Sequence, residues 1–329
     1  MSASSSLLPG VPLVESALFA LSIDEMDLTG PERDVARELN QRGFAVIDFP
    51  DPDIFARIER IKHRLAARFP IDLLAPDTIK NHGDMRIQDA WQTDPDVKAI
   101  ATNPEMMALL GKLYGRRAIP FQTLNFPVGT QQHPHTDAVH FSSLPERFMC
   151  GVWVAFEDIG PDAGPLVYYP GSHKWPILNN AMIGRRGWNS VSPSAQTPFE
   201  AVWRELVSTS GIPPETFLAR KGQSLIWTAN LLHGGSLQND PTLTRWSQVT
   251  HYYFADCIRY TPAFSDEPLG RLDLRSITNI ASGEREPNRL LGEAPAPSSE
   301  QVGGSRWRRW LNRALGPIIT GLGKDHRAL

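Results

Sequence analysis

The densest cluster of potentially reactive side chains in this chain of 329 residues lies between Gly129 and His140. Within this cluster, His135 and Asp137 are separated by a single residue. If the segment is a β-strand, both side chains point to the same side and could bind one ion. A His-x-Asp pair is common by chance, so the prediction depends on further ligands elsewhere in the chain.

A second histidine and an arginine follow in a later part of the chain. His233 lies at the end of a predicted strand, and Arg245 begins another predicted strand. Two histidines and one carboxylate can bind one face of Fe(II) and leave its other positions open. By strand alternation, Arg245, Ser247, Val249 and His251 share a face. A guanidinium beside a hydroxyl suits a carboxylate, so these residues favour an iron site that binds a chelating 2-oxo acid.

The order and spacing of these residues resemble the phytanoyl-CoA dioxygenase-like branch of the Fe(II)/2-oxoglutarate oxygenases. The resemblance extends to the segment between the two predicted ligand strands, Gly164-Pro-Leu-Val-Tyr-Tyr-Pro-Gly-Ser-His-Lys174. Arg220-Lys-Gly222, Trp227 and the early segment from Leu39 to Ile47 also match. Together these motifs place the similarity over residues 32–255.

The resemblance implies a fold, a set of cofactors and a set of site residues. The implied cofactors are Fe(II), 2-oxoglutarate as cosubstrate, and O2. The expected activity is that of a dioxygenase which hydroxylates an aliphatic C–H bond of a small molecule and releases succinate and CO2. The implied site residues are the iron ligands His135, Asp137 and His233 and the cosubstrate-binding residues Arg245, Ser247, Thr123 and Asn125.

The chain departs from the pattern of the family at two places. Gln223 follows Gly222 where the family often has aspartate, and two glycines separate His233 from Ser236 where the family commonly has Gly-Ser. Neither change affects a predicted iron ligand, so we expect both to alter local turns. Asp137 is present, whereas related halogenases replace that carboxylate with a small residue, and hydroxylation is therefore favoured over halogenation.

Two functions of other classes are compatible with parts of the sequence. His133-x-His135-x-Asp137 also resembles the motif of metallo-β-lactamase-like metallohydrolases, but that motif continues with a histidine where this chain has alanine. A catalytically silent, cupin-like binding protein is the second alternative, and the complete set of predicted ligands argues against it. His133 and His140 are more simply interpreted as hydrogen-bonded histidines of the loop or of the surroundings of the site.

The elements that must position these residues are short strands preceded by helices. Hydrophobic periodicity and the Gly, Pro and Asn boundaries predict them. The predicted helices cover 30–43, 54–69 and 104–113, and the predicted strands cover 44–49, 119–128, 148–156, 166–169, 224–228 and 245–254. The expected fold is therefore mainly β, a double-stranded β-helix (jelly-roll, cupin-like) core with flanking N-terminal helices.

The domain organisation follows from the same pattern. Residues 1–30 form a lead-in, and residues 31–260 form the predicted oxygenase domain. An irregular insertion at 176–220 is long enough to be a lid, and it contains a predicted helix at 200–207. Residues 261–329 form a C-terminal extension that ends in a basic amphipathic helix. That helix could contact a membrane surface, but Pro317 interrupts it early, which favours packing on the domain.

Composition limits the remaining classes of function. The chain has 33 Lys+Arg and 36 Asp+Glu, a formal net charge of −3, which argues against a dedicated nucleic-acid binder. No apolar run is long enough for a transmembrane helix, and the N-terminus lacks the pattern of a secretory signal. Two cysteines, Cys150 and Cys257, are too few for a disulfide framework. These features indicate a cytoplasmic enzyme with a small-molecule substrate, and they leave its oligomeric state open.

Overall fold

Antiparallel strands form the framework that holds the predicted site residues. The computed structural model describes residues 7–73, 75–80, 85–188, 190 and 194–295. Its strands are β1 (Phe44–Asp48), β2 (Ile87–Gln88), β3 (Ala118–Phe126), β4 (Ser142–Leu144), β5 (Met149–Ala155), β6 (Leu166–Tyr168), β7 (Glu215–Phe217), β8 (Gln223–Thr228), β9 (His233–Gly235), β10 (Ser247–Phe254), β11 (Ile258–Tyr260), β12 (Ile277–Thr278) and β13 (Arg285–Glu286). The large sheet has the order β1-β8-β5-β10-β3-β2, and a smaller sheet has the order β7-β6-β9.

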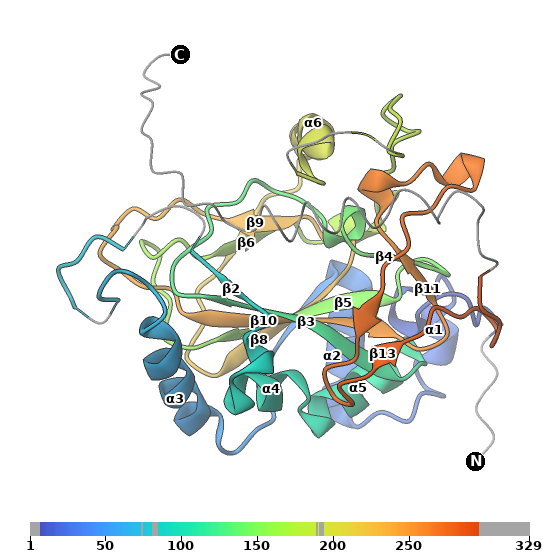
Figure 1. Ribbon diagram of the computed structural model, residues 1–329. Coiled ribbons are helices and arrows are strands. Elements are labelled where there is room, and N and C mark those ends of the chain that lie inside the picture. Colours follow the sequence, from blue (N-terminus) through green and yellow to red (C-terminus); the bar gives the residue numbers. More distant parts are fainter. Residues whose placement is uncertain (1–6, 74, 81–84, 189, 191–193, 296–329) are drawn as a thin grey trace. The chain divides into compact units, whose positions relative to one another are not determined.

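The helices that precede β3 cover one face of the large sheet, and the smaller sheet lies across the other face (Figure 1). The helices are α1 (Phe19–Ser22), α2 (Gly30–Arg42), α3 (Ile54–Ala66), α4 (Pro95–Ala101), α5 (Pro104–Tyr114) and α6 (Glu200–Ser210). Within the described ranges, none of these helices has the length and apolar character needed to span a bilayer. The layered arrangement is the mainly β, jelly-roll architecture with flanking helices that the sequence predicts.

Alternation along the strands assigns neighbouring residues to two different cores. In β5, Val152 and Val154 pack into the core beneath the helices, together with Ile58 and Leu110. Trp153, which lies between them in the sequence, points instead into the core between the two sheets. The smaller core contains Phe44, Phe126, Trp153, Ala155, Ile159, Ala163, Tyr168, Phe217, Ala219, Leu225, Trp227, Leu231 and Val249. The site described below opens into this second core.

The compact part of the chain extends further at both ends than the predicted oxygenase domain. Among the described residues, it extends from Leu7 to Glu293. Val14, Phe19 and Ile23 are buried in the core beneath the large sheet, so the described part of the lead-in belongs to the same folded unit. At the other end, β12 and β13 pair, and Ile277 is buried. The predicted basic helix near the C-terminus lies outside the described residues.

The insertion at 176–220 contains regular structure and a small core of its own. Its predicted helix is confirmed and extends to Ser210, and β7 adds an edge strand to the smaller sheet. The buried members of this core are Val139, Tyr169, Leu178, Ala195, Phe199, Trp203, Leu232 and Ala263. Because Val139 and Leu232 come from segments that carry predicted metal ligands, the insertion is packed directly onto the site.

A buried carboxylate fixes α4 against α3 and provides a test of the helical layer. The Asp94 side chain accepts hydrogen bonds from the backbone N–H groups of Asp96 and Val97, at 2.9 and 3.1 Å, and so caps α4. Arg64 of α3 donates two further hydrogen bonds of 2.7 Å to the same carboxylate. Asp94 therefore satisfies the end of one helix and binds a cation of the other.

We expect Asp94→Ala to lower the free energy of unfolding by about 1–3 kcal/mol, because the cap and the charge-assisted hydrogen bonds are both lost. Denaturant titration followed by circular dichroism measures this change. Asp53→Ala is the matched control: Asp53 precedes α3, is exposed and makes no capping hydrogen bond. Equal midpoints for the two variants would show that Asp94 does not hold the helices together.

Candidate metal centre

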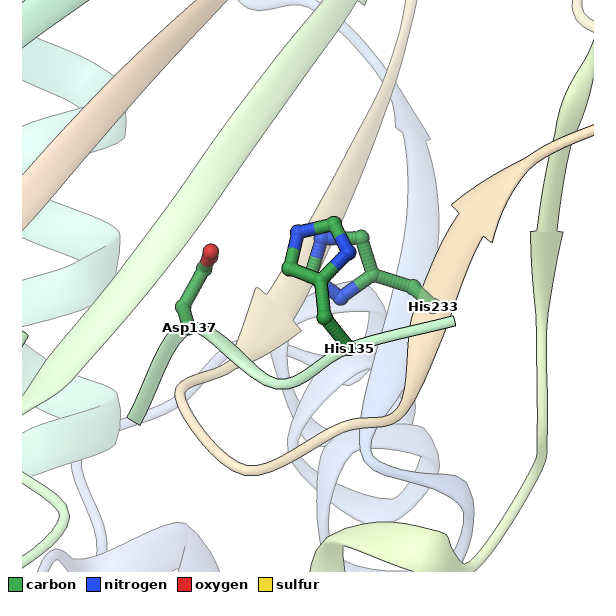
Figure 2. Close-up of side chains that lie close together, drawn as sticks. All are labelled: His135, Asp137 and His233. Atoms are coloured by element: carbon green, nitrogen blue, oxygen red, sulfur yellow. The ribbon is translucent and has the colours of Figure 1, made fainter. Parts of the chain in front are cut away.

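Three side chains with metal-binding atoms converge at one end of the space between the sheets. One ligand atom from each of His135, Asp137 and His233 lies within 4.8 Å of the other two, and all three residues are buried. Figure 2 shows His135 and Asp137 extending from one connecting segment and His233 extending from the neighbouring strand. Among the described residues, these three form a cluster whose side-chain types and spacing could hold a metal ion.

The backbone brings these ligands together in a way that strand alternation does not describe. His135 and His233 form an isolated antiparallel bridge, in which each backbone N–H donates to the other's carbonyl at 2.8 and 2.9 Å. Asp137 then begins a short 3-10 turn over Asp137–Val139. The segment through His135 and Asp137 is therefore not a continuous strand. The turn, rather than a two-residue strand repeat, directs the carboxylate toward the histidines.

Both histidine rings are held in the orientation that a metal ligand requires. His135 Nδ1 lies 2.9 Å from the carbonyl oxygen of His133, and His233 Nδ1 lies 3.0 Å from that of Leu231. A carbonyl oxygen only accepts hydrogen bonds, so each Nδ1 carries the proton and each Nε2 presents its lone pair. Burial lowers the pKa of His135 to about 3, and the neighbouring His233 acts in the same direction. The His135 ring is therefore neutral at physiological pH.

The Asp137 carboxylate is oriented by two side chains of the large sheet. Trp227 Nε1 donates a hydrogen bond of 2.8 Å to Asp137 Oδ2, and His251 Nε2 lies 3.6 Å from the same oxygen. Burial alone would raise the pKa of the Asp137 carboxyl. The hydrogen bond with His251 and the electrostatic attraction of the neighbouring histidine rings outweigh burial and hold this pKa well below its usual range. Asp137 is thus an anion whose Oδ1 is available to a metal.

Glycines create the space that these ligands occupy. Gly151 of β5 lies directly opposite Trp227 of β8, and a Cβ at Gly151 would stand 2.4 Å from the indole ring. The absence of a side chain at Gly151 therefore leaves room for the indole ring of Trp227, which reaches Asp137. A Cβ at Gly234 would stand 2.7 Å from the carbonyl oxygen of Gln132, so the loop before His135 also needs a glycine beside it.

Arg245 is a buried cation at the other end of the same pocket. Its side chain is 1% exposed, and its guanidinium lies 5.8 Å from the ring centre of Trp153. Burial lowers the pKa of Arg245 to about 10, with Glu157 opposing, so the group remains charged at neutral pH. Its Nε and Nη1 atoms have no hydrogen-bond partner in the described part of the chain. A buried cation with unused donors fits an incoming carboxylate.

Three further residues were predicted to contact the cosubstrate. The Ser247 hydroxyl lies on the Arg245 side of β10, is buried and has no hydrogen-bond partner among the described residues. Thr123 and Asn125 lie on the opposite face of β3, where Asn125 donates to Gln248. The neighbours on β3 that line the pocket are Gln122, Leu124 and Phe126. Thr123 and Asn125 therefore face away from the pocket, because neighbouring positions of a strand lie on opposite faces.

The pocket that joins the two ends has a volume of about 250 Å³. His140 and His251 line it, together with Gln196 of the insertion. His133 is exposed and does not line it; its role here is to accept the hydrogen bond from His135. The two-metal alternative needs His133 as a ligand, so the geometry does not support that hydrolase.

The two departures from the family pattern have local explanations. The Gln223 side chain accepts a hydrogen bond of 2.9 Å from the backbone N–H of Arg220, and it thereby closes the turn before β8. Gly235 passes so close to the preceding loop that a Cβ would stand 3.0 Å from the backbone nitrogen of Gln131. Ser236 follows and donates to the carbonyl oxygen of Pro165. Both changes shape turns and leave the ligands in place, as predicted.

Comparison with known proteins identifies the family. The family model for phytanoyl-CoA dioxygenase (PhyH) matches residues 40–240, which is more than half of the chain. The chain belongs to the PhyH family. The resemblance drawn from the sequence motifs is thus confirmed, and with it the class of enzyme, an oxygenase that depends on 2-oxoglutarate. Among curated proteins, none matches this sequence.

Solved structures share the fold of this PhyH-family chain. The non-heme α-ketoglutarate-dependent carbocyclase SnoK from nogalamycin biosynthesis has a TM-score of 0.55 at 15% identity, covering 83% of this chain and 95% of its own. The epimerase SnoN, in complex with Fe3+, α-ketoglutarate and nogalamycin RO, has a TM-score of 0.52 at 18% identity, covering 82% and 96%. EctD from S. alaskensis, with 2-oxoglutarate and 5-hydroxyectoine, has a TM-score of 0.51 at 20% identity, covering 73% and 80%.

The Trp227 hydrogen bond to Asp137 can be tested without any assay of turnover. We expect Trp227→Phe to weaken Co(II) or Fe(II) binding about 10–100-fold, because a hydrogen-bond donor to a metal ligand orients that ligand and tunes its basicity. Anaerobic metal titration measures this affinity. Trp246→Phe is the matched control, since Trp246 is buried in the core beneath the helices and does not line the pocket. If both variants bind metal like the wild type, Trp227 packs beside the ligand without orienting it.

Proposed function

We propose that this PhyH-family protein is an Fe(II)- and 2-oxoglutarate-dependent dioxygenase that hydroxylates an aliphatic C–H bond of a small molecule. His135, Asp137 and His233 would hold the iron, and Arg245 would bind the far carboxylate of 2-oxoglutarate. The single observation that carries the proposal is the presence of both groups in one pocket: a buried His-Asp-His cluster and a buried arginine whose donors are unused.

The spacing along β10 suits a short dicarboxylate that spans the two groups. Val249 is paired with Trp153, and His251 is paired with Gly151, so the two levels differ by two residues, or about 7 Å. The guanidinium of Arg245 lies over Trp153, whereas Asp137 contacts His251. A 2-oxo acid that binds the metal through its carboxylate and keto oxygen would therefore extend toward Arg245 and its unpaired N–H groups.

The donor set is appropriate for iron. Two neutral imidazole nitrogens and one carboxylate oxygen form the facial arrangement typical of non-haem Fe(II) oxygenases. When bound, Fe(II) with 2-oxoglutarate and O2 supplies the oxidising chemistry, and the cosubstrate leaves as succinate and CO2. The residues of this chain supply orientation and an apolar lining: Trp227 donates its hydrogen bond to Asp137, and Trp153 and Val249 line the pocket.

Hydroxylation is the outcome that these residues favour among several that the fold supports. The solved structures of similar fold include proteins described as a carbocyclase and an epimerase, and a shared fold does not fix the reaction. The carboxylate of Asp137 occupies the position that halogenases leave free for a halide. Transfer of oxygen to a C–H bond needs no further group from the protein, and we therefore propose it for this chain.

The test uses the purified full chain, handled without oxygen until Fe(II) and 2-oxoglutarate are added. We expect slow succinate formation and oxygen uptake even without a primary substrate. Asp137→Ala should abolish both, because it removes a ligand. Arg245→Ala should retain metal binding. It should raise the concentration of 2-oxoglutarate needed for half-maximal turnover about 10–100-fold, because charge-assisted hydrogen bonds to the cosubstrate are lost. The exposed Arg204→Ala is the control for removal of an arginine.

Two results would contradict the proposal. The first is tight zinc binding accompanied by hydrolysis of esters or lactams, which would favour the metallohydrolase. The second is an unchanged 2-oxoglutarate requirement in Arg245→Ala, which would place the anchor for the cosubstrate elsewhere. A protein that binds Fe(II) and 2-oxoglutarate but forms no succinate would be the silent, cupin-like binding protein.

A further inference from the structure

The wall of the pocket beyond the metal ligands has a distinctive chemical character. Gln122 of β3 is paired with His251, at the level of Asp137, and so lies at the metal rather than at the Arg245 end. His140 and Phe141 follow the turn that carries Asp137, and the His140 ring centre lies 6.2 Å from that of His135. Side-chain amides, an imidazole and a phenyl ring thus line this part of the pocket, and Leu124 and Leu166 add apolar surface to its wall.

The insertion supplies one of these amides and holds it firmly. Gln196 lines the pocket and forms a side-chain hydrogen bond with His140. Its backbone N–H donates to the Ser194 hydroxyl, and its carbonyl accepts from the N–H of Phe199, which starts the turn leading into α6. Phe199 is fully buried in the core of the insertion. Gln196 is therefore a fixed part of the wall rather than a side chain on a loose loop.

The charged residues that line the pocket argue against cationic and anionic substrates. Among the described residues that line it, the one carboxylate is Asp137, which is already assigned to the metal. A cationic substrate would therefore lose its hydration without gaining a counter-ion. The cationic residues are Arg245, assigned to the cosubstrate, and Arg86, which stands exposed at the rim. Attraction of an anion by an exposed charge is weak, because water and salt screen it.

Polarity and size argue against a long apolar substrate. An alkyl chain placed against Gln122, Gln196 and His140 would remove water from these groups without replacing their hydrogen bonds, at a cost of about 1–3 kcal/mol for each group. The pocket volume of about 250 Å³ must hold the cosubstrate as well as the reacting part of a substrate.

We infer that the site takes an uncharged, oxygen-rich substrate, a polyhydroxylated ring or the glycosyl part of a larger molecule. Gln122, Gln196 and His140 bind its hydroxyl or ether oxygens, and Phe141 covers an apolar face of the ring. This inference rests on the proposed function, because it uses the metal ligands and Arg245 to decide which part of the pocket is left. Gln196 makes the insertion a determinant of specificity.

Binding is tested first, with the full chain loaded with Zn(II) and 2-oxoglutarate so that no turnover occurs. Saturation-transfer NMR compares methyl glycosides and cyclitols with amino sugars, uronates, and acyl thioesters. We expect the neutral hydroxylated set to bind preferentially. Gln122→Leu and Gln196→Leu should each weaken this binding about fivefold, the value of one neutral hydrogen bond. Gln41→Leu, on the exposed surface of α2, should leave it unchanged.

Turnover then separates failure of this inference from failure of the proposed function. With Fe(II) in place of Zn(II), a neutral ligand that binds should raise succinate release above the rate seen without substrate. Preference for acyl thioesters, amines or uronates, or no binding by the neutral set, would overturn the inference while succinate formation upholds the proposed function. Complete absence of succinate under all conditions would instead overturn the proposed function, whatever the Zn(II) complex binds.

Discussion

The two backbone hydrogen bonds between His135 and His233 are the constraint on which the rest of the site depends. They attach the loop after β3 to the smaller sheet, and they place two imidazoles side by side, with ring centres 4.7 Å apart. A bridge of this kind requires close contact of backbones, which Gly234 permits. Because the loop is fixed at His135, the turn that follows can present Asp137 to the same point.

The charges of the pocket are balanced only when it is considered together with its proposed ligands. Asp137 and Arg245 are opposite charges buried at separate levels of one pocket, and among the described residues Arg245 forms no ion pair. Isolated buried charges are costly, so each needs a partner of its own. A divalent cation beside Asp137 and a dianionic 2-oxo acid that reaches Arg245 would satisfy both, and the sum of all four charges is zero. This balance explains why a stable fold can bury Arg245 without a protein carboxylate.

Sequence patterns predicted the strands that carry the site, but not the irregular geometry at its centre. The strands at 118–126, 149–155 and 247–254 are rich in aromatic and β-branched residues and lie between Gly, Pro or Asn residues, so their positions can be predicted. The shared face of Arg245 and His251 then follows from the geometry of a strand. Strands of two or three residues, such as β2 and β9, are too short to show a period. Thr123 and Asn125 share a face, as predicted from alternation, but the sequence does not show which face of the strand lies toward the pocket, and the residues of β3 that line the pocket are on the other face.

Other contacts could not be predicted because they join residues distant in the sequence. The sequence motifs include Trp227 but assign it no role, and only its pairing opposite Gly151 reveals that it can reach Asp137. Gln196 lies in a segment without periodicity, and its place in the pocket depends on burial of Phe199 and Trp203 against Val139. These contacts connect the insertion to the turn of Asp137. A change in the core of the insertion therefore acts on the ligand turn and on the substrate wall together, and the specificity element cannot be exchanged independently of the metal centre.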